Sequence, residues 1–420
     1  MQVELKYGRG SRLVSIPEGA EVAVLRPAPV PPLPDFEAAL ADALHEAGGI
    51  FNRPAPRSVA VCAPDSTRPF PSARALAVAL KKIFSVWPAL AVGSVTVIVG
   101  GGLHPPAKEK ELAGILPPGF TGVQVIGHDA EASRMTDLGR TRRGTPVRVN
   151  TELAAAEFKV ALGQVDPHQF VGFTGGAKAA AVGCAAAEMI ESNHALMFKP
   201  GAEVGRLTGN PVREDLDEAG RIIGLDLAVN AVLGADHRPV AVFSGEPEDA
   251  LRRAAKVCSD VYGIGIEEKF DAALISCGGH PKDGNLYQAQ KGLNLASMAV
   301  KEGGLIAMLA ECGEGVGDER YLEYVSRFAT AREALEEFQR GPFRMGWHKS
   351  YLFGRTLTRY DVVVESVLDE PLLRRCHLPA GPVEGALSEF VRRFPGGKPR
   401  IAVVPNANTT YFYPATAAGK

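Results

Sequence analysis

The 420-residue chain has only six cysteines, and they are scattered, with no C-x-x-C pair. Such spacing argues against a zinc ribbon, a disulfide framework or a cysteine-ligated cluster, and it indicates a reducing compartment. No apolar run reaches the roughly 18 residues that a membrane span needs. The N-terminus lacks a basic segment leading into an apolar run, so no signal peptide is predicted. We therefore expect a cytoplasmic protein with no membrane partner.

A strong excess of charge is also absent, because the formal net charge is −2. This balance gives no electrostatic reason to expect nucleic acid as a partner. Hydrophobic residues make up 46% of the chain and charged residues 22%, as in soluble globular proteins. The length predicts two or three domains.

Short β-rich runs alternate with amphipathic stretches along most of the chain, which is the pattern of mainly parallel sheets flanked by helices. We expect an α/β protein of two domains, residues 1–265 and 266–420. The first 27 residues read as two or three short strands joined by glycine-rich turns, and a final strand at residues 400–405 could return to either sheet. Strands are predicted at residues 58–63, 94–99, 123–126, 158–162, 225–232, 270–276 and 304–309, and helices at 35–47, 72–84, 108–115, 247–261 and 287–300, with a further helix start at Asn210-Pro211.

The segment 166–178 combines His168 with a glycine-rich turn that ends in a lysine, Lys178. Glycines at 172, 175 and 176 permit a sharp turn that presents main-chain N–H groups to an anion. A lysine at the end of such a turn is either a phosphate contact or a nucleophile. Alanines on both sides of Lys178 exclude the Walker A pattern, which argues against an ordinary ATP or GTP site.

His194 lies sixteen positions after Lys178. One straight helix would hold the two residues about 24 Å apart, at roughly 1.5 Å per residue. Gly183 is a plausible break, after which a helix over residues 184–198 would carry His194 back toward the turn. His168 and His194 could each be a hydrogen-bonded packing histidine or a ligand, and the glycine turn between them favours a site.

Polar clusters also follow two earlier predicted strands, where open α/β sheets build their sites. After the strand at 58–63 come Asp65, Thr67 and Arg68, which form either a helix cap with a solvated arginine or an anion grip in which Asp65 orients Arg68. After the strand at 94–99, His104 stands between three glycines and two prolines. It is either a well-placed general base or part of a plain turn.

The second half of the chain offers a similar arrangement. A strand ends at the polar segment 278–285, and Gln288 and Lys291 follow on one face of the next helix, near its N-terminus. They form either an anion site or a solvated helix face. Trp347 and its neighbours are weaker evidence, since a tryptophan there can simply be core.

Taken together, these segments resemble the nickel-pincer lactate racemase family. The resemblance covers residues 50–300 in the family's order, and continues more weakly to residue 400. It is carried by residues 65–69, His104, residues 166–178, His194 and residues 287–291.

The resemblance implies a cofactor, a nickel-pincer nucleotide (pyridinium-3,5-bisthiocarboxylic acid mononucleotide carrying nickel) covalently attached to Lys178. His194 would be the protein's nickel ligand, with His104 and His168 as the acid/base pair. Other implied roles are substrate binding by Arg68, Gln288, Lys291 and Trp347, and cofactor binding by Asp65, Thr67, Gly175 and Gly176.

The implied activity is racemisation or epimerisation of a small 2-hydroxy carboxylate, lactate or a related acid, in an interdomain cleft. One histidine removes the 2-hydroxyl proton while the C2 hydrogen leaves as hydride, which returns on the other face of the planar keto acid. Partners would be the 2-hydroxy acid and the proteins that make the cofactor, and a homo-oligomer is compatible with the sequence.

Two alternatives stay open from the residues alone. One is a catalytically silent relative that binds an organic acid or the cofactor. The other is a zinc-dependent hydrolase that would hold its metal through His104, His168 and His194.

Overall fold

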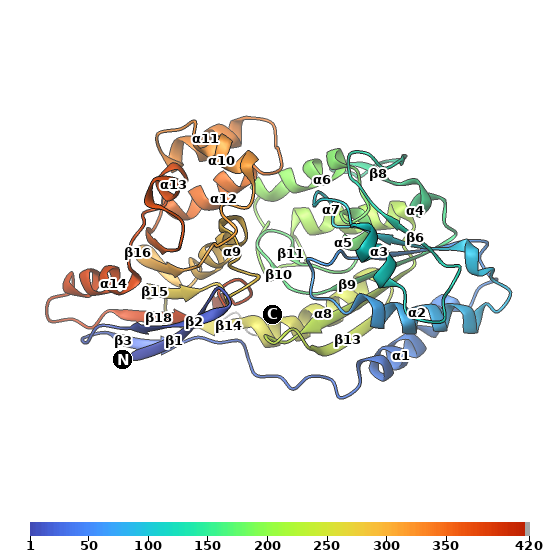
Figure 1. Ribbon diagram of the computed structural model, residues 1–420, viewed down its shortest axis with the longest axis horizontal. Helices are drawn as coiled ribbons and strands as arrows, with labels where there is room; N and C mark the ends of the chain where they lie inside the picture. The colour runs from blue at the N-terminus through green and yellow to red at the C-terminus, as the bar shows by residue number, and fades with distance from the viewer. Residues whose placement is uncertain (416–420) are drawn as a thin grey trace. The chain divides into compact units, whose positions relative to one another are not determined.

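The computed structural model describes residues 1–415 and divides the chain into two compact units. One unit is Pro29–Val261, and the other joins Met1–Ala28 to the chain from Tyr262 onward. The helices and strands of both units are labelled in Figure 1. Among the described residues, no helix combines the length and the apolar character that a membrane crossing requires.

A six-stranded sheet forms the centre of the unit Pro29–Val261. Its neighbouring strands are parallel except at one edge, where β13 runs antiparallel to β12. In spatial order the strands are β13 (Pro239–Gly245), β12 (Leu227–Leu233), β9 (Phe158–Gln164), β4 (Val59–Ala63), β5 (Val95–Val99) and β6 (Gln124–Gly127). Every residue of β4 and β12 is buried, as expected for central strands covered on both faces.

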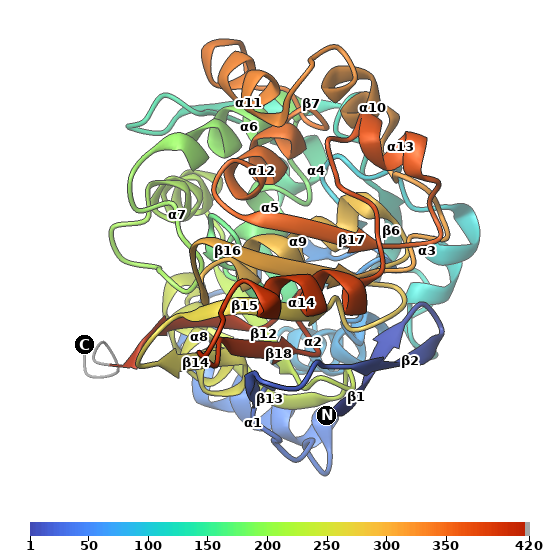
Figure 2. The same cartoon turned by 90° about the vertical axis from the view of Figure 1, so that its left-hand side faces the viewer.

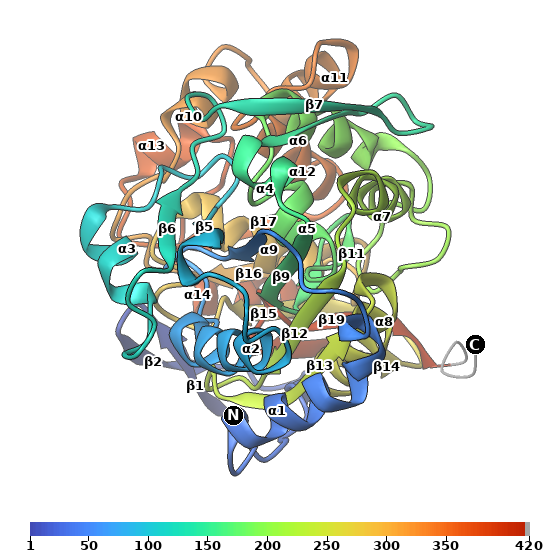
Figure 3. The same cartoon turned by 90° about the vertical axis from the view of Figure 1, so that its right-hand side faces the viewer.

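Helices cover this sheet on its two faces. The helices α1 (Phe36–Glu46) and α2 (Ser72–Val86) pack their apolar stripes against one face (Figure 3). A short helix, α5 (Lys178–Ala181), contacts β9 and β4 and packs against α7 (Pro211–Ile223). The unit's other elements are α3 (Glu109–Ile115), α4 (Thr151–Ala155), α6 (Ala187–His194), α8 (Pro247–Tyr262), β7 (Met135–Arg140), β8 (Pro146–Asn150), β10 (Pro167–His168) and β11 (Gly172–Phe173), with short 3₁₀ turns at Ala47–Phe51, Val92–Ser94 and Ala195–Phe198.

The second unit is built on a five-stranded sheet in which all pairings are parallel. Its strands, in spatial order, are β17 (Asp361–Glu365), β16 (Val300–Leu309), β15 (Phe270–Ser276), β18 (Arg400–Val404) and β3 (Glu21–Val24). Beside it run a two-stranded pairing of β14 (Gly263–Ile266) with β19 (Tyr411–Pro414) and an antiparallel hairpin of β1 (Gln2–Tyr7) with β2 (Gly10–Ser15).

Alternate residues of β15 enter two separate cores, one on each face of this sheet. Ala273 and Ile275 pack with α9 (Leu286–Ala296), while Ala272 and Leu274 pack with α14 (Val383–Arg392) and the β1–β2 hairpin. Figure 2 shows α14 lying on the sheet, where it contacts β16 and β17. The remaining helices are α10 (Glu319–Val325), α11 (Ala331–Arg340), α12 (His348–Leu357) and α13 (Glu370–Arg375).

The N-terminal segment does not belong with the domain in which we expected it. The domain prediction placed it in residues 1–265, but β3 pairs with β18 in the second unit's sheet, and the blue strands β1–β3 lie with that unit in Figure 1. Leu5 and Val14 of the hairpin are fully buried in the same core. Burial of these apolar side chains and the strand pairing therefore hold the segment there. The strand predicted at residues 400–405 is β18, and it pairs with β15 in this sheet and not in the first one.

The predicted fold class is confirmed, since both units are mainly parallel sheets flanked by helices. The predicted break after Lys178 is also present, because α5 ends at Ala181 and α6 begins at Ala187. The second helix is shorter than the predicted 184–198, since residues 195–198 form a 3₁₀ turn. As expected, the Asn210 side chain caps α7 and Pro211 is its first residue.

Candidate active site

The candidate site in the unit Pro29–Val261 lies at the carboxyl ends of three adjacent strands. From β4 the chain proceeds outward to β5 and β6, and then returns to β9 on the other side of β4. Reversal of strand order opens a crevice at the carboxyl ends of such strands. The segments leaving β4, β5 and β9 carry Asp65, His104 and His168 respectively, so one edge of the sheet gathers all three.

Asp65 and His104 form a hydrogen-bonded pair across the loops that follow β4 and β5. The Asp65 Oδ2 atom is 2.7 Å from Nδ1 of His104, and Thr67 donates its hydroxyl to Oδ1 at 2.6 Å. Burial opposes ionisation of Asp65, but the bonds from His104 and Thr67 outweigh it and lower the pKa of the carboxyl. An ionised carboxylate only accepts, so Nδ1 of His104 carries a proton and, in the neutral ring, Nε2 keeps a lone pair.

Asp65 therefore does something other than the role first expected of it. We expected Asp65 to orient the Arg68 guanidinium, whereas its carboxylate holds His104 and Thr67. Arg68 contributes its positive charge, which also lowers the pKa of Asp65, and its main-chain N–H donates to the Asp65 carbonyl.

The glycines before His104 allow the loop to rest directly on the segment after α5. A Cβ on Gly100 would lie 2.2 Å from the main-chain oxygen of Gly183, and a Cβ on Gly101 would lie 2.0 Å from the Asp65 carboxylate. The Gly102 N–H also donates to the Gly183 oxygen at 3.2 Å. The His104 loop is thus docked, through backbone, on the segment that links Lys178 to His194.

The glycine turn before Lys178 packs closely against the side chains of Val165 and Leu251. A Cβ on Gly175 would lie 2.6 Å from Val165, and one on Gly176 would lie 3.0 Å from Leu251. Both glycines have positive φ, which side chains rarely adopt. The Gly176 N–H donates to Asn230 Oδ1 at 3.0 Å. This corrects the expectation of bare N–H groups, because at Gly176 the donor is already used inside the protein.

Two imidazoles, those of His168 and His194, meet around Phe170. The Phe170 ring contacts His168 edge-on, with 4.7 Å between ring centroids, and contacts His194 with 5.2 Å. Burial, and then the positive charge of Lys178, lower the pKa of His194 to about 3. Because the helix is broken after Lys178, His194 lies within range of the lysine's charge, which lowers its pKa. His194 is therefore neutral near neutral pH.

His128, which follows β6, has a structural role. Its ring lies 3.0 Å from the Ala185 carbonyl through Nε2 and 3.3 Å from Asn150 Nδ2 through Nδ1. Burial lowers the pKa of this imidazole. It ties the strand end of β6 to the segment before α6.

In the second unit, Gln288 and Lys291 lie on α9, which follows β15 at the corresponding switch point of that sheet. The Asn285 side chain caps the helix by accepting the Gln288 N–H at 3.0 Å. Beside them, buried Lys349 donates to Gln290 Oε1 at 3.0 Å, and its Nζ lies 4.3 Å from the centroid of the Tyr287 ring. Burial, and then the charge of nearby Lys291, hold the pKa of Lys349 well below its usual range.

Trp347 is half-buried among neighbours of its own unit. Its ring stacks on Tyr324 with 4.6 Å between centroids, and the guanidinium groups of Arg344 and Arg327 lie 5.0 and 5.5 Å from the ring centroid. These contacts give the Trp347 side chain a packing role in its own unit.

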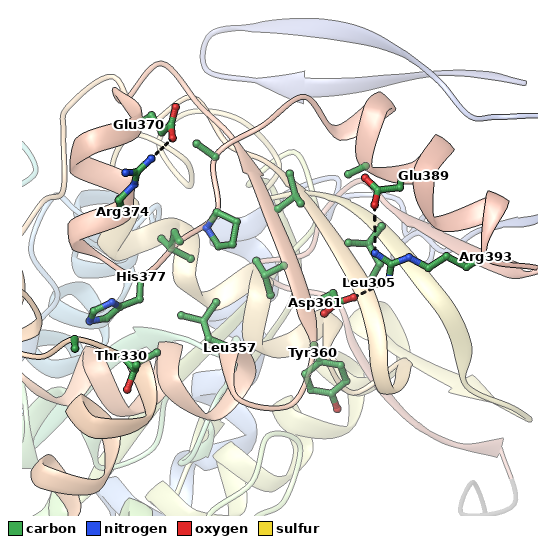
Figure 4. Close-up of a pocket in the computed structure, with 18 residues that line it drawn as sticks. Leu305, Thr330, Leu357, Tyr360, Asp361, Glu370, Arg374, His377, Glu389 and Arg393 are labelled. Atoms are coloured by element: carbon green, nitrogen blue, oxygen red, sulfur yellow. Dashed lines mark hydrogen bonds and ion pairs between the residues drawn. The ribbon is translucent and has the colours of Figure 1, made fainter.

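A groove elsewhere in the second unit contains none of the predicted site residues. It has a volume of about 840 Å³ and lies beside β17 and α14 (Figure 4). Its charged side chains form ion pairs with one another, since Arg374 pairs with Glu370 and Arg393 pairs with both Asp361 and Glu389. The groove therefore offers no comparable set of acid/base groups.

Comparison with known proteins agrees with the sequence pattern over most of the chain. A model of the lactate racemase N-terminal domain matches residues 7–205, and a model of the lactate racemase C-terminal domain matches residues 266–410. The chain belongs to the lactate racemase family. Racemases are isomerases, and the second domain model begins shortly after α8 ends at Tyr262.

Two characterised relatives are lactate racemases. The chain is 26% identical to the enzyme of Lactiplantibacillus plantarum over 358 residues, which covers 83% of each chain. It is 29% identical to that of Thermoanaerobacterium thermosaccharolyticum over 285 residues, covering 67% of this chain and 66% of the relative.

Solved structures show the same fold. The lactate racemase apoprotein from Thermoanaerobacterium thermosaccharolyticum superposes with a TM-score of 0.89 at 22% identity, covering 98% of this chain and all of that one. A Thermotoga maritima protein from a structural genomics programme superposes with a TM-score of 0.66 at 15% identity, covering 92% of this chain and all of that one.

Within the family framework, the structure assembles the predicted residues in two places. Asp65, Thr67, Arg68 and His104 lie at the same sheet edge as Lys178, His168 and His194, and Gln288 and Lys291 share α9 in the other unit. Sequence reasoning missed Phe170 and Asn193, and it left the role of Lys349 open. The available signals were weak: Phe170 lies two residues after His168, and Asn193 directly precedes His194.

Proposed function

We propose that the protein is a racemase or epimerase of a small 2-hydroxy carboxylate, acting with a nickel-pincer nucleotide tethered to Lys178. The observation that carries the proposal is the assembly at the carboxyl ends of β5, β4 and β9. It combines an aspartate-held histidine, a second histidine, a lysine and a buried neutral histidine.

The histidines His104 and His168 have complementary hydrogen bonding, which supports their use as an acid/base pair. His104 donates through Nδ1 to Asp65, so its Nε2 can accept a proton from a substrate hydroxyl. His168 accepts the Val171 N–H at Nδ1, at 3.4 Å, so its neutral ring carries the proton on Nε2. One group can take a proton while the other gives one, and the roles exchange in the reverse direction.

Positive charge beside these histidines suits a carboxylate substrate. Arg68 lies close enough to affect the Asp65 carboxyl, and a guanidinium binds carboxylates with two parallel hydrogen bonds. We assign carboxylate binding to Arg68, and assign Gln288 and Lys291 of the other unit to substrate contacts.

The donors that the chain offers fit a metal that arrives with a cofactor. His194 is buried and neutral, so it can supply one nitrogen ligand. Among residues 1–415, no group of three or more histidine, cysteine, aspartate or glutamate side chains is placed to hold a metal ion. A nucleotide with two sulfur-bearing arms would bring the remaining donors, and Lys178, whose charge lowers the pKa of His194, would tether it.

When bound, the cofactor would supply an acceptor for the hydride that leaves C2 of the substrate. The chain's own residues do the rest. Arg68 holds the carboxylate, His104 and His168 move the hydroxyl proton from opposite faces, and the packed glycine turn keeps Lys178 in place.

The same donor count disfavours the zinc-hydrolase alternative. Such an enzyme would need His104, His168 and His194 around one ion, but among residues 1–415 no three such side chains are placed to hold a metal ion. The second candidate is a catalytically silent protein that binds an organic acid or the cofactor. A measurement of racemase activity distinguishes the two.

A panel of 2-hydroxy acids tests the proposal, with each acid offered as a single enantiomer to protein produced together with the cofactor-making enzymes. Loss of optical rotation for at least one acid is expected, with an added mass on the intact protein that the Lys178→Ala variant lacks. Adduct-bearing protein that racemises no member of the panel would favour the silent binding protein.

A further inference from the structure

We propose that Asn193 and Asp215 are positioning residues that hold His194 with its proton on Nδ1 and its Nε2 lone pair available as a ligand. The inference rests on the proposed function for the metal that Nε2 would bind. The tautomer itself is a property of the protein alone.

The orientation of the Asn193 amide is determined by two acceptors. Its Nδ2 donates to the Val212 carbonyl at 3.1 Å and to Asp215 Oδ2 at 2.9 Å. Both are oxygen atoms that accept hydrogen bonds, so the amide nitrogen must face them and the amide oxygen must face away. That oxygen, Oδ1, lies 3.2 Å from Nδ1 of His194.

Asp215 is itself held as a pure acceptor. Thr141 donates its hydroxyl to Oδ1 at 2.5 Å and Thr145 donates to Oδ2 at 2.8 Å. With the Asn193 amide, three donors therefore meet the two carboxylate oxygens. Asp215 and Asn193 are each only 1% exposed, so no solvent competes for these bonds.

The state of His194 follows from this chain of contacts. An amide oxygen can only accept, so Nδ1 of the neutral ring is the nitrogen that bears the proton. Nε2 then has no proton and can coordinate a metal. Histidines that bind metals commonly donate their other ring N–H to an acceptor, which fixes the tautomer and the ring orientation.

His128 provides an internal control, because its hydrogen bonds favour the other tautomer. The Asn150 amide oxygen accepts the Glu152 N–H at 3.0 Å, so its nitrogen faces Nδ1 of His128 at 3.3 Å. The His128 Nε2 atom lies 3.0 Å from the Ala185 carbonyl. His128 is therefore an Nε2–H tautomer, in contrast with His194.

Nitrogen-15 NMR of histidine side chains in the cofactor-free protein tests the proposal, because long-range couplings distinguish the two tautomers. A His194→Gln variant assigns the His194 signals. We expect an Nδ1–H pattern for His194 and an Nε2–H pattern for His128. The Asp215→Asn and Asn193→Leu variants should lower the Nδ1–H population of His194 and leave His128 unchanged. The matched Asn150→Leu variant should alter only His128.

An Nε2–H pattern for His194 in the unmodified protein would overturn the proposal, and this result needs no variant to fold. An unchanged His194 pattern in both variants would overturn it equally. Failure of the panel of hydroxy acids would remove the proposed function but not the tautomer result, so the two failures are distinguishable.

A second measurement connects the tautomer to the metal. In cofactor-loaded protein, nickel loss to a chelator should be faster in Asn193→Leu than in the unmodified protein, because removal of a direct partner of a metal-binding histidine typically costs about 10–100-fold in metal affinity. Asn150→Leu should release nickel at the unmodified rate. Equal release from all three proteins would contradict the positioning role.

Discussion

At the scale of single residues, Asp65 determines what His104 can do. The carboxylate fixes the His104 proton on Nδ1 and so leaves Nε2 as the base. Asp65→Asn replaces the acceptor by an amide that can turn its nitrogen to the ring. We expect turnover to fall at least ~10²-fold, the usual range for loss of a positioned acid/base group, with an unchanged circular dichroism spectrum.

Thr67→Val is the matched control for Asp65→Asn. It removes one hydrogen bond to the same carboxylate, 2.6 Å long, and a 3.3 Å contact with Nδ1 of His104, and it leaves the bond between Asp65 and His104. Its effect on turnover should be much smaller. Equal losses in the two variants would mean that the loop as a whole matters and not the carboxylate.

Buried His128 makes stability depend on pH in a definite direction. Its pKa is lowered by burial, so the unfolded chain takes up a proton at a higher pH than the folded protein does. Stability from this group is fully present above about pH 6.5 and is lost as the pH falls toward the folded-state pKa, by at most ~1.4 kcal/mol per pH unit.

His128→Gln should flatten that dependence. Thermal midpoints at pH 7.5 and pH 5.5 measure it, and the drop between them should be smaller in the variant than in the unmodified protein. The same drop in both proteins would show that His128 is not neutral in the folded state.

At the scale of elements, the loop between β5 and α3 depends on glycine packing. A Cβ on Gly100 would meet the Gly183 carbonyl oxygen at 2.2 Å, and both partners are backbone. Gly100→Ala should therefore lower the thermal midpoint and displace His104. A displacement of about 1 Å can cost on the order of 10²-fold in turnover.

Gly114 gives the contrasting case within α3. Nothing lies within 4 Å of a Cβ added there, so Gly114→Ala should stabilise the protein by ~0.5–1 kcal/mol and leave turnover unchanged. If Gly100→Ala behaved like Gly114→Ala, the close contact with Gly183 would be wrong.

The elements themselves could largely be predicted from the sequence, because central strands are continuous apolar runs and helix starts carry caps such as Asn210. The ends of β4, β5 and β9 therefore located Asp65, His104 and His168 in advance. The contacts of Asn193 could not be predicted. Its partner Asp215 lies 22 positions away on another helix, and no local pattern reports such a pairing.

At the scale of the whole molecule, the N-terminal hairpin is the part that sequence reasoning assigned to the wrong unit. Its strands are short and alternate in burial, so their pattern shows an apolar face but not which core receives it. The pairing of β3 with β18 joins positions almost 380 residues apart along the chain.

Two leucines of this hairpin test the assignment. Leu5 is 1% exposed and lies in the second unit's core, whereas Leu13 on the neighbouring strand is 57% exposed. Leu5→Ala should cost about 2–5 kcal/mol and Leu13→Ala very little. Hydrogen exchange should show the loss of protection in β15 and β18. A loss confined to β4 and β9 would place the hairpin in the other unit.

The most direct measurement of the proposed chemistry follows the hydrogen at C2. One enantiomer of a C2-deuterated 2-hydroxy acid that the cofactor-loaded protein racemises is incubated in ordinary water, and the deuterium content of the opposite enantiomer is measured. Hydride transfer with proton exchange only at the hydroxyl predicts that the product keeps its deuterium. Replacement of deuterium by solvent hydrogen at C2 would mean that a base removes a proton from carbon, and would contradict the roles proposed for His104, His168 and the Lys178-bound cofactor.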